Sequence, residues 1–181
     1  MRELSLNVLD IAQNSVVANA TVIEIEIIEN STTNDLFIGI YDNGKGMSES
    51  QLESVLDPFF TTRTTRKVGM GVPLFKFAAE MTGGKFEIES EEGVGTKVKA
   101  YFKSNHLDFT PIGDMASTVI SLITMNLNID FIYKRSLDKK SFTLDTRQLK
   151  EILGDVPLNE PSIAQWIKDY VNENTKQLSE V

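Results

Sequence analysis

Apolar residues follow two different periods along this 181-residue chain, and the period changes from segment to segment. Between residues 4 and 19 they recur every three or four positions, which predicts a helix with one buried face. From residue 22 the period becomes two, with isoleucines alternating with glutamates, which is typical of a half-buried strand. The residues on the predicted helix face are Leu4, Val8, Ile11, Ser15 and Ala18, and those on the strand face are Ile23, Ile25 and Ile27.

A second strand, "LFIGIYD", follows the turn sequence "NSTTND", and the two strands therefore predict a hairpin. "SESQLESVL" predicts a short helix with Ser48 as its N-cap and Gln51 completing a capping box. "DPFFTTRTTRKVG" has no apolar period and predicts a loop. A helix from Met70 to the pair Gly83-Gly84 follows, and "KFEIES" and "TKVKAYF" predict another hairpin.

The C-terminal part repeats this mixture after a break at residues 104–110. "GDMASTVISLITMN" predicts a helix, "NIDFIYKRS" and "SFTLD" predict strands, and "DTRQLKEILG" predicts a short helix with Asp145 and Gln148 as a capping box. An amphipathic helix begins at Ser162. Hairpins mixed with one-faced helices predict an α+β fold, a mostly antiparallel sheet with helices on one face. We expect one domain over residues 1–104, and a helix-strand-strand-helix extension over residues 105–181 that packs on it or extends it.

Composition narrows the classes of protein. Hydrophobic residues make up 41% of the chain and charged residues 24%, which is typical of a globular protein. The net charge of −8 argues against nucleic acid or an anionic membrane as partner, because both require a positive surface. The absence of cysteine excludes disulfides, thiolate chemistry and zinc-cysteine sites. No run of 18 apolar residues occurs, and we expect a cytoplasmic protein.

The first helix carries a polar stripe, because Asn7, Asp10 and Asn14 fall within one narrow arc. One interpretation is that the stripe faces water, as it does on most amphipathic helices. The other is that Asn14 binds Mg²⁺, which prefers oxygen ligands beside substrate phosphates. Asp10, one turn away, would then orient or deprotonate a water or hydroxyl near the terminal phosphate.

Asp42 ends the second strand on the same side as its apolar residues, within "YDNGKGM". A carboxylate there would accept a hydrogen bond from the exocyclic amine of adenine. Gly44 and Gly46 lack a Cβ atom, so a flat ligand would fit against their backbone. The alternative is an ordinary turn, since Asp-Asn-Gly is a common turn sequence.

Two features of the loop and the helix that follows it suit phosphate. Gly69 and Gly71 precede the helix, and free N–H groups at a helix N-terminus bind phosphate. Arg63, Arg66 and Lys67 place positive charge just before these glycines. A flexible helix start and a solvated charge cluster are the alternatives.

The order of these motifs resembles the GHKL superfamily, which includes DNA gyrase, heat-shock chaperone ATPases, histidine kinases and MutL. Asp-x-x-x-Asn-Ser on a helix is followed by D-x-G-x-G, P-F-F-T-T, G-x-G and Gly-Thr, and the resemblance covers roughly residues 4–103. It implies a two-layer α/β sandwich of the Bergerat type that binds ATP and Mg²⁺.

The resemblance also implies roles for single residues. Asn14 matches the magnesium asparagine, Asp42 the adenine-binding aspartate, and Thr96 the threonine that supports the adenine pocket. "DPFFTT" with Arg63 resembles the start of the ATP lid of histidine kinases. The remaining nucleotide-binding residues implied are Gly44, Gly46, Met47, Thr61, Thr62, Gly69, Met70, Gly71 and Val72.

Three positions depart from the family pattern. Many histidine kinases carry asparagine at the position of Asp10, and gyrase-like and MutL-like members carry glutamate, so this chain keeps the carboxylate with a shorter reach. Val17 replaces a lysine that is frequent in histidine kinases. Lys67 and Val68 replace a common Gly-Thr in the glycine-rich segment. These departures favour nucleotide binding over fast chemistry.

Two classes of function follow. Only nine residues precede Asp10, so we expect no complete sensor kinase, and we interpret His106 as an exposed residue rather than a phospho-acceptor. The first class is a protein kinase acting in trans or a slow ATPase, with Asp10 as the catalytic base. The second is a module in which ATP changes a protein interface with little turnover. A pseudo-ATPase that binds no nucleotide is a third hypothesis.

The last predicted helix carries an apolar stripe, and the sequence does not show what that stripe packs against. Ile163, Trp166, Ile167 and Tyr170 lie along it, and such a stripe packs in a core or forms a dimer or partner surface. The expected partners are ATP and an unidentified protein substrate or regulator, and a second copy of the chain is a further candidate.

Overall fold

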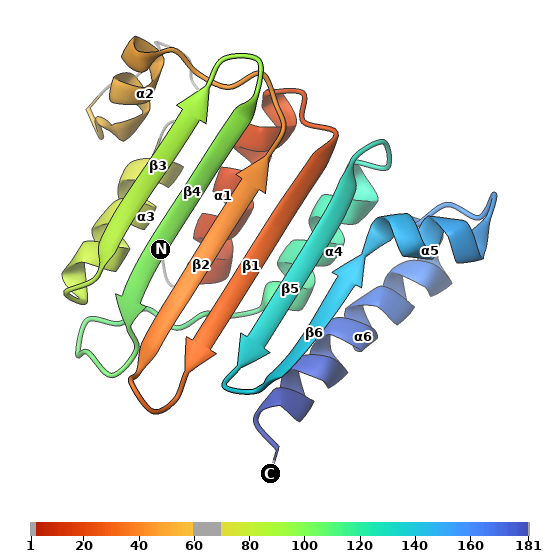
Figure 1. The fold of residues 1–181 in the computed structure, drawn as a ribbon. Coiled ribbons are helices and arrows are strands. Elements are labelled where there is room, and N and C mark those ends of the chain that lie inside the picture. Colours follow the sequence, from red (N-terminus) through yellow and green to blue (C-terminus); the bar gives the residue numbers. More distant parts are fainter. Residues whose placement is uncertain (1–2, 60–69, 181) are drawn as a thin grey trace.

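A single six-stranded sheet organises the chain, with its helices on one side (Figure 1). The computed structural model describes residues 3–59 and 70–180. The elements in chain order are α1 (Leu4–Val17), β1 (Val22–Asn30), β2 (Asp35–Asp42), α2 (Glu49–Leu56), α3 (Gly71–Met81), β3 (Lys85–Glu91), β4 (Gly95–Lys103), α4 (Met115–Met125), β5 (Asp130–Leu137), β6 (Lys140–Asp145), α5 (Thr146–Leu153) and α6 (Pro161–Leu178).

The strand order is β3-β4-β2-β1-β5-β6, which confirms the α+β fold with a mostly antiparallel sheet. The two predicted hairpins of the N-terminal part, β1-β2 and β3-β4, are both present, and β2 pairs with β4 between them. The exception to antiparallel pairing is β5, which lies parallel to β1 and pairs antiparallel with β6. Residues beyond 104 therefore continue the same sheet, while the division of the chain at residue 104 stays a prediction.

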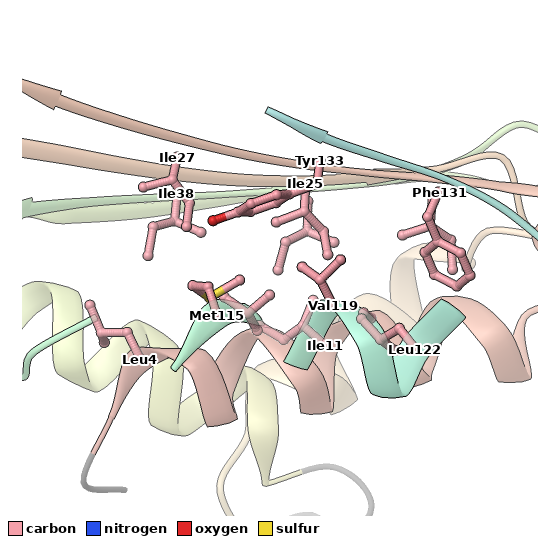
Figure 2. Packing of buried hydrophobic residues seen from close by; sticks show 14 of the residues in the cluster. Leu4, Ile11, Ile25, Ile27, Ile38, Met115, Val119, Leu122, Phe131 and Tyr133 are labelled. Atoms are coloured by element: carbon pink, nitrogen blue, oxygen red, sulfur yellow. The ribbon is translucent and has the colours of Figure 1, made fainter. Parts of the chain in front are cut away.

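The core lies between the sheet and the helices behind it. Alternate side chains of each strand point to that side, because successive residues of a strand face opposite ways. Figure 2 shows Ile25, Ile27 and Ile38 of the sheet above side chains of α1 and α4, among them Leu4 and Met115. All five side chains are at most 2% exposed, so the apolar period read from the sequence is the period of burial.

One of the two predicted capping boxes forms. The Ser48 hydroxyl accepts from the Gln51 N–H, and the Gln51 side chain accepts from the Ser48 N–H, so the box of α2 is confirmed. The box predicted with Gln148 is wrong: Asp145 caps α5 by accepting from the Arg147 N–H and also pairs with the Arg147 guanidinium. The nearby guanidinium gives the carboxylate a stronger partner than an amide would.

Two helix ends differ from the prediction by one or two residues. Helix α1 ends at Val17, because the chain turns through Asn19 in the left-handed region, with φ of 59°. Helix α6 begins at Pro161, whose fixed φ suits the first helical turn. Across the two described stretches, no helix has both the length and the apolar character needed to cross a bilayer.

Candidate functional site

A cavity of about 480 Å³ opens where the C-terminal half of α1, helix α2 and the strands β2 and β4 meet. Asn14, Asp42 and Thr96 lie on its wall, although they come from three different elements. Most of the remaining wall is apolar, so the cavity combines a hydrophobic lining with a few polar groups, as small-molecule sites do. The apolar lining residues include Ile11, Ile40, Val72, Ile88 and Val98.

Asp42 is held in one orientation by two hydrogen bonds. The Ser15 hydroxyl of α1 donates to one carboxylate oxygen, and the Gly44 N–H donates to the other at 2.8 Å. A buried or half-buried carboxylate needs such donors to offset its lost hydration. The bonds also fix which lone pairs remain available toward the cavity.

Thr96 lies opposite Asp42 in the β2-β4 register and is held from its other side by Ser90. The Ser90 and Thr96 hydroxyl oxygens are 2.8 Å apart, and the Ser90 oxygen also accepts from the Met47 N–H at 2.8 Å. Ser90 therefore ties the β3-β4 hairpin to the segment after Asp42. This arrangement fixes the floor of the cavity without any ligand.

The two serines that support the site, Ser15 and Ser90, were not among the residues predicted from the sequence to form it. Ser15 lies on the apolar face of α1, and it was assigned to core packing although it follows Asn14 directly. Ser90 lies two positions after Ile88, where the period of two predicts an apolar residue. A polar residue at an apolar phase of its element was the available signal in both cases.

Gly44 and Gly46 are explained by close packing of the backbone. A Cβ atom on Gly44 would lie 2.8 Å from the Ala18 carbonyl oxygen, and one on Gly46 would lie 2.0 Å from the Glu91 carbonyl oxygen. Gly46 also has a φ of +70°, which disfavours residues with a side chain. Close packing is therefore a sufficient reason for both glycines, and room for a flat ligand stays a prediction. Gly46 and Met47 line the cavity and Gly44 does not, and their roles in binding stay predictions.

Replacing Gly46 with alanine is expected to destabilise the fold by about 3 kcal/mol, from a left-handed backbone and a steric clash together. Gly93 is a matched control, because its φ is +79° but no atom lies within 4 Å of the Cβ position. Gly93→Ala should cost only about 1 kcal/mol. Urea denaturation measures both, and equal losses would show that packing against Glu91 is not the reason for Gly46.

Asp10 lies beside the start of α3 rather than in the wall of the cavity. A Cβ atom on Gly71 would lie 2.9 Å from the Cβ of Asp10, so only glycine allows this close approach. Burial raises the pKa of the Asp10 carboxyl above its usual value. Among the residues that the structure describes, no side chain caps α3 at its N-terminus, next to this carboxylate.

Asp10→Asn provides a test of this burial. Because the pKa of Asp10 is raised above the unfolded value of 3.8, the charged carboxylate costs stability at pH 7. We expect the variant to have a midpoint temperature a few degrees higher at pH 7, and the gain should shrink as pH falls and vanish below 3.8. Thermal unfolding across this pH range measures it, with exposed Asp155→Asn as control. A gain independent of pH would contradict the assignment.

The water-facing interpretation of the polar stripe is wrong for Asn7. Its side chain is 0% exposed, and neither amide atom has a hydrogen-bond partner among the described residues. Asn14 and Asp10 are partly exposed. The stripe of α1 therefore lies against protein at one end and reaches the cavity at the other.

The predicted phosphate-binding segment is only partly described. Gly71 and Val72 are buried at the start of α3, Val72 lines the cavity, and Met70 lies just before it, 39% exposed. Lys45, which the sequence reading did not single out, is a cation on the cavity wall. The predictions for Thr61, Thr62, Arg63 and Gly69 fall outside the described residues. Among the residues that are described, no group of three His, Cys, Asp or Glu side chains is placed to hold a metal ion.

Comparison with protein families gives one match over the N-terminal part. The family model described as histidine kinase-, DNA gyrase B-, and HSP90-like ATPase matches residues 1–106. This stretch contains α1 to β4 and every lining residue of the cavity. It leaves α4 to α6 outside the match.

Curated relatives are sensor proteins much longer than this chain. Sensor histidine kinase YvrG of Bacillus subtilis is 28% identical over 94 residues, 50% of this chain and 16% of that protein. A putative sensor protein of Shewanella frigidimarina is 30% identical over 103 residues, 56% of this chain and 16% of that protein. Sensor histidine kinase ZraS of Salmonella typhimurium is 35% identical over 65 residues, which are 36% of this chain and 14% of that protein. The matched part is therefore less than a fifth of each relative.

Solved structures share the fold at low sequence identity. The Aquifex aeolicus MutL ATPase domain complexed with ADP has a TM-score of 0.51 at 17% identity, covering 84% of this chain and 69% of that one. The N-terminal domain of a DNA repair protein has a TM-score of 0.53 at 17% identity, covering 80% of this chain and 53% of that one. Both structures cover more of this chain than the family model does. At this sequence identity they show the fold alone.

Proposed function

Because the chain belongs to the family of histidine kinase-, DNA gyrase B- and HSP90-like ATPases, we propose that it binds Mg-ATP and acts as a protein kinase in trans or as a slow regulatory ATPase. One observation carries this proposal: Asn14, Asp42 and Thr96, from α1, β2 and β4, line a single cavity. The cavity of about 480 Å³ is within the usual range for small-molecule sites.

The residues of the cavity suit adenine. Its apolar walls accept a flat ring, and the Asp42 carboxylate, oriented by Ser15 and Gly44, would accept from an exocyclic amine. Thr96, held by Ser90, supplies a hydroxyl beside it. An oriented acceptor discriminates between bases because a base without the amine would leave the carboxylate unpaired.

The phosphate end of the site would lie toward α3. The amide oxygen of Asn14 is the proposed ligand of Mg²⁺, and the first N–H groups of α3 and the Lys45 ammonium suit phosphate oxygens. When bound, Mg-ATP would supply the transferable phosphoryl group, with its charge offset by the metal. Asp10, whose pKa is raised by burial, would accept the proton of an attacking hydroxyl or water.

A second candidate, an ATP-gated interaction module, is favoured by the packing of α2. This helix forms part of the cavity wall through Ser50, Gln51, Ser54 and Val55, yet none of its residues is fully buried. A ligand in the cavity would therefore contact a weakly anchored helix. Its displacement would change a surface that another protein can read.

Pulldown with ATP or ADP, followed by phosphosite mapping on the bound proteins, tests these alternatives. A phosphorylated partner supports the kinase, and phosphate release without a modified partner supports the ATPase. Binding that depends on the nucleotide without phosphate release or transfer supports the module. Failure of ATP and ADP to bind, with or without Mg²⁺, would contradict the whole proposal.

A further inference from the structure

The side of the sheet opposite the core has no helix over it within the described residues. Helices α1, α3 and α4 lie behind the sheet in Figure 1, and α6 packs on the same side, against α4 and the core residue Phe142. The six strands form this open face in the order β3-β4-β2-β1-β5-β6, and β2 is the middle one of the five strands from β3 to β5. The cavity lies on the other side, so the open face is not part of the proposed nucleotide site.

Aromatic and apolar side chains gather along the middle of the open face. The rings of Phe37 and Tyr101 lie 5.1 Å apart, and Ile28, level with Phe37, is 42% exposed. The Tyr41 side chain lies over Gly39, since a Cβ atom there would be 2.5 Å from its hydroxyl. Burial, together with Glu26 and Glu24, raises the pKa of Tyr41 to about 12, so this side chain stays neutral.

Charged residues flank this strip with opposite signs on its two sides. Toward one edge, β4 carries Lys97 and Lys99. Toward the other, β1 carries Glu24 and Glu26. The two strands beyond these, β3 next to β4 and β5 next to β1, carry the opposite charge to their neighbour. These residues are Glu87 and Glu89 on β3, and Lys134 on β5.

The registers place these charges at matching heights. Glu24 and Lys97 both pair with Tyr41, and Glu26 and Lys99 both pair with Gly39. The paired residues of β1, β2 and β4 therefore lie at the same height along the strands at each of these two positions. On the outer strands, Glu87 is level with Lys99 and Lys134 is level with Glu26.

We propose that a second copy of this chain covers the open face, related to the first by a two-fold axis along β2. Such an axis keeps the height and exchanges the two sides of the sheet, so β4 of one copy faces β1 of the other. Lys97 then faces Glu24, and Lys99 faces Glu26, each pair occurring twice. Glu87 faces Lys134 by the same operation.

The same operation brings apolar groups together at the centre. Phe37 of β2 faces its own copy, and Ile28 of one copy faces Tyr101 of the other. Two sheets that pack face to face lie about 10 Å apart with strands within about 30° of each other, a spacing that side chains of this size fill. Opposite charges meet at the Lys97–Glu24, Lys99–Glu26 and Glu87–Lys134 positions, and this favours a second copy over an unrelated partner. Asp35, at the start of β2, faces its own copy, and its charge is offset by the ion pair with Lys103.

Several of these charges lack a partner within one chain. Among the described residues, Lys97, Lys99 and Glu26 form no ion pair, although both lysines lie level with a glutamate of β3. Glu24 does pair with Lys134 in the single chain, and an exposed pair of this kind contributes little. Glu87 likewise pairs with Lys85 in the single chain. The dimer therefore gives ion-pair partners to Lys97, Lys99 and Glu26, which have none within the described part of one chain.

Light scattering after size exclusion, at low salt, is the test. We expect two chains per particle for the wild type. Lys97→Glu with Lys99→Glu should give one chain, because each reversed position would face a glutamate of the other copy. Glu24→Lys with Glu26→Lys should also give one chain. Mixing the two variants should restore dimers, since all four pairs of a mixed dimer are attractive, two with the wild-type charges and two with both charges reversed.

Lys139→Glu with Lys176→Glu is the matched control, because it makes the same change in net charge in the β5-β6 turn and α6. It should leave the dimer intact. All variants should bind ADP with the affinity of the wild type, because the open face lies away from the cavity. Loss of the dimer and loss of ADP binding are therefore separate outcomes, and this test is independent of the test of the proposed function. A monomeric wild type, a dimer that survives both reversals, or a mixture that stays monomeric would overturn the proposal. Loss of the dimer only in Trp166→Ala would assign the interface to α6.

Discussion

Replacing Asp42 with asparagine is expected to weaken ADP binding by about 10- to 150-fold, the loss of one hydrogen bond to a charged group of about 1.5–3 kcal/mol. The carboxylate accepts from Ser15 and from the Gly44 N–H, and its remaining lone pairs are available to the cavity. An asparagine of the same shape would present an amide NH₂ group in place of one of these oxygens. Isothermal titration calorimetry with ADP and Mg²⁺ measures the change.

Asp35 at the other end of β2 is the control for this variant. It is exposed and forms an ion pair with Lys103, far along the strand from the cavity. Asp35→Asn should leave ADP affinity within twofold of the wild type. An Asp42→Asn protein that keeps its fold and binds ADP as tightly as the wild type would remove Asp42 from the site.

Asp10→Asn is expected to lower the rate of phosphoryl transfer or ATP hydrolysis by about 10²- to 10⁴-fold, the usual contribution of a general base. ADP affinity should stay close to the wild type, because Asp10 lies against Gly71 and is not part of the cavity wall. A single-turnover measurement with ATP labelled on the terminal phosphate separates the chemical step from binding.

Asp10→Glu is the conservative variant that distinguishes a base from a structural role. It keeps the carboxylate with one more methylene, so part of the turnover should remain and should rise with pH through the pKa of the new carboxyl. Equal turnover in the wild type and in Asp10→Asn would favour the interaction module. Loss of ADP binding in Asp10→Asn would instead make Asp10 a structural residue of the α1-α3 contact.

The local elements were predictable because burial and periodicity coincide in this fold. The alternation of Ile23, Ile25 and Ile27 with glutamates follows directly from a sheet that is covered on one face only. The polar residues that interrupt such patterns, Asn14 and Asp42, mark the place where two elements meet around a cavity. The sequence order of the family motifs then linked segments that periodicity alone treats separately.

Other features depended on contacts that no local pattern encodes. The parallel pairing of β5 with β1 joins residues about a hundred positions apart, and neither strand carries a signal for its partner. The support of Thr96 by Ser90 became visible only once the β3-β4 register was known. The reason for Gly46 was likewise non-local, because the Glu91 carbonyl fills the place of its missing Cβ atom.

The most direct test of the account is an ADP titration of the ¹⁵N-labelled wild-type chain with Mg²⁺, followed by the backbone amide signals. The account predicts saturation at one nucleotide per chain, with the largest shifts at Gly46, Met47 and Thr96 around the cavity and at Gly44, which holds the Asp42 carboxylate. Unchanged spectra at saturating ADP, or shifts confined to α5 and α6, would contradict it.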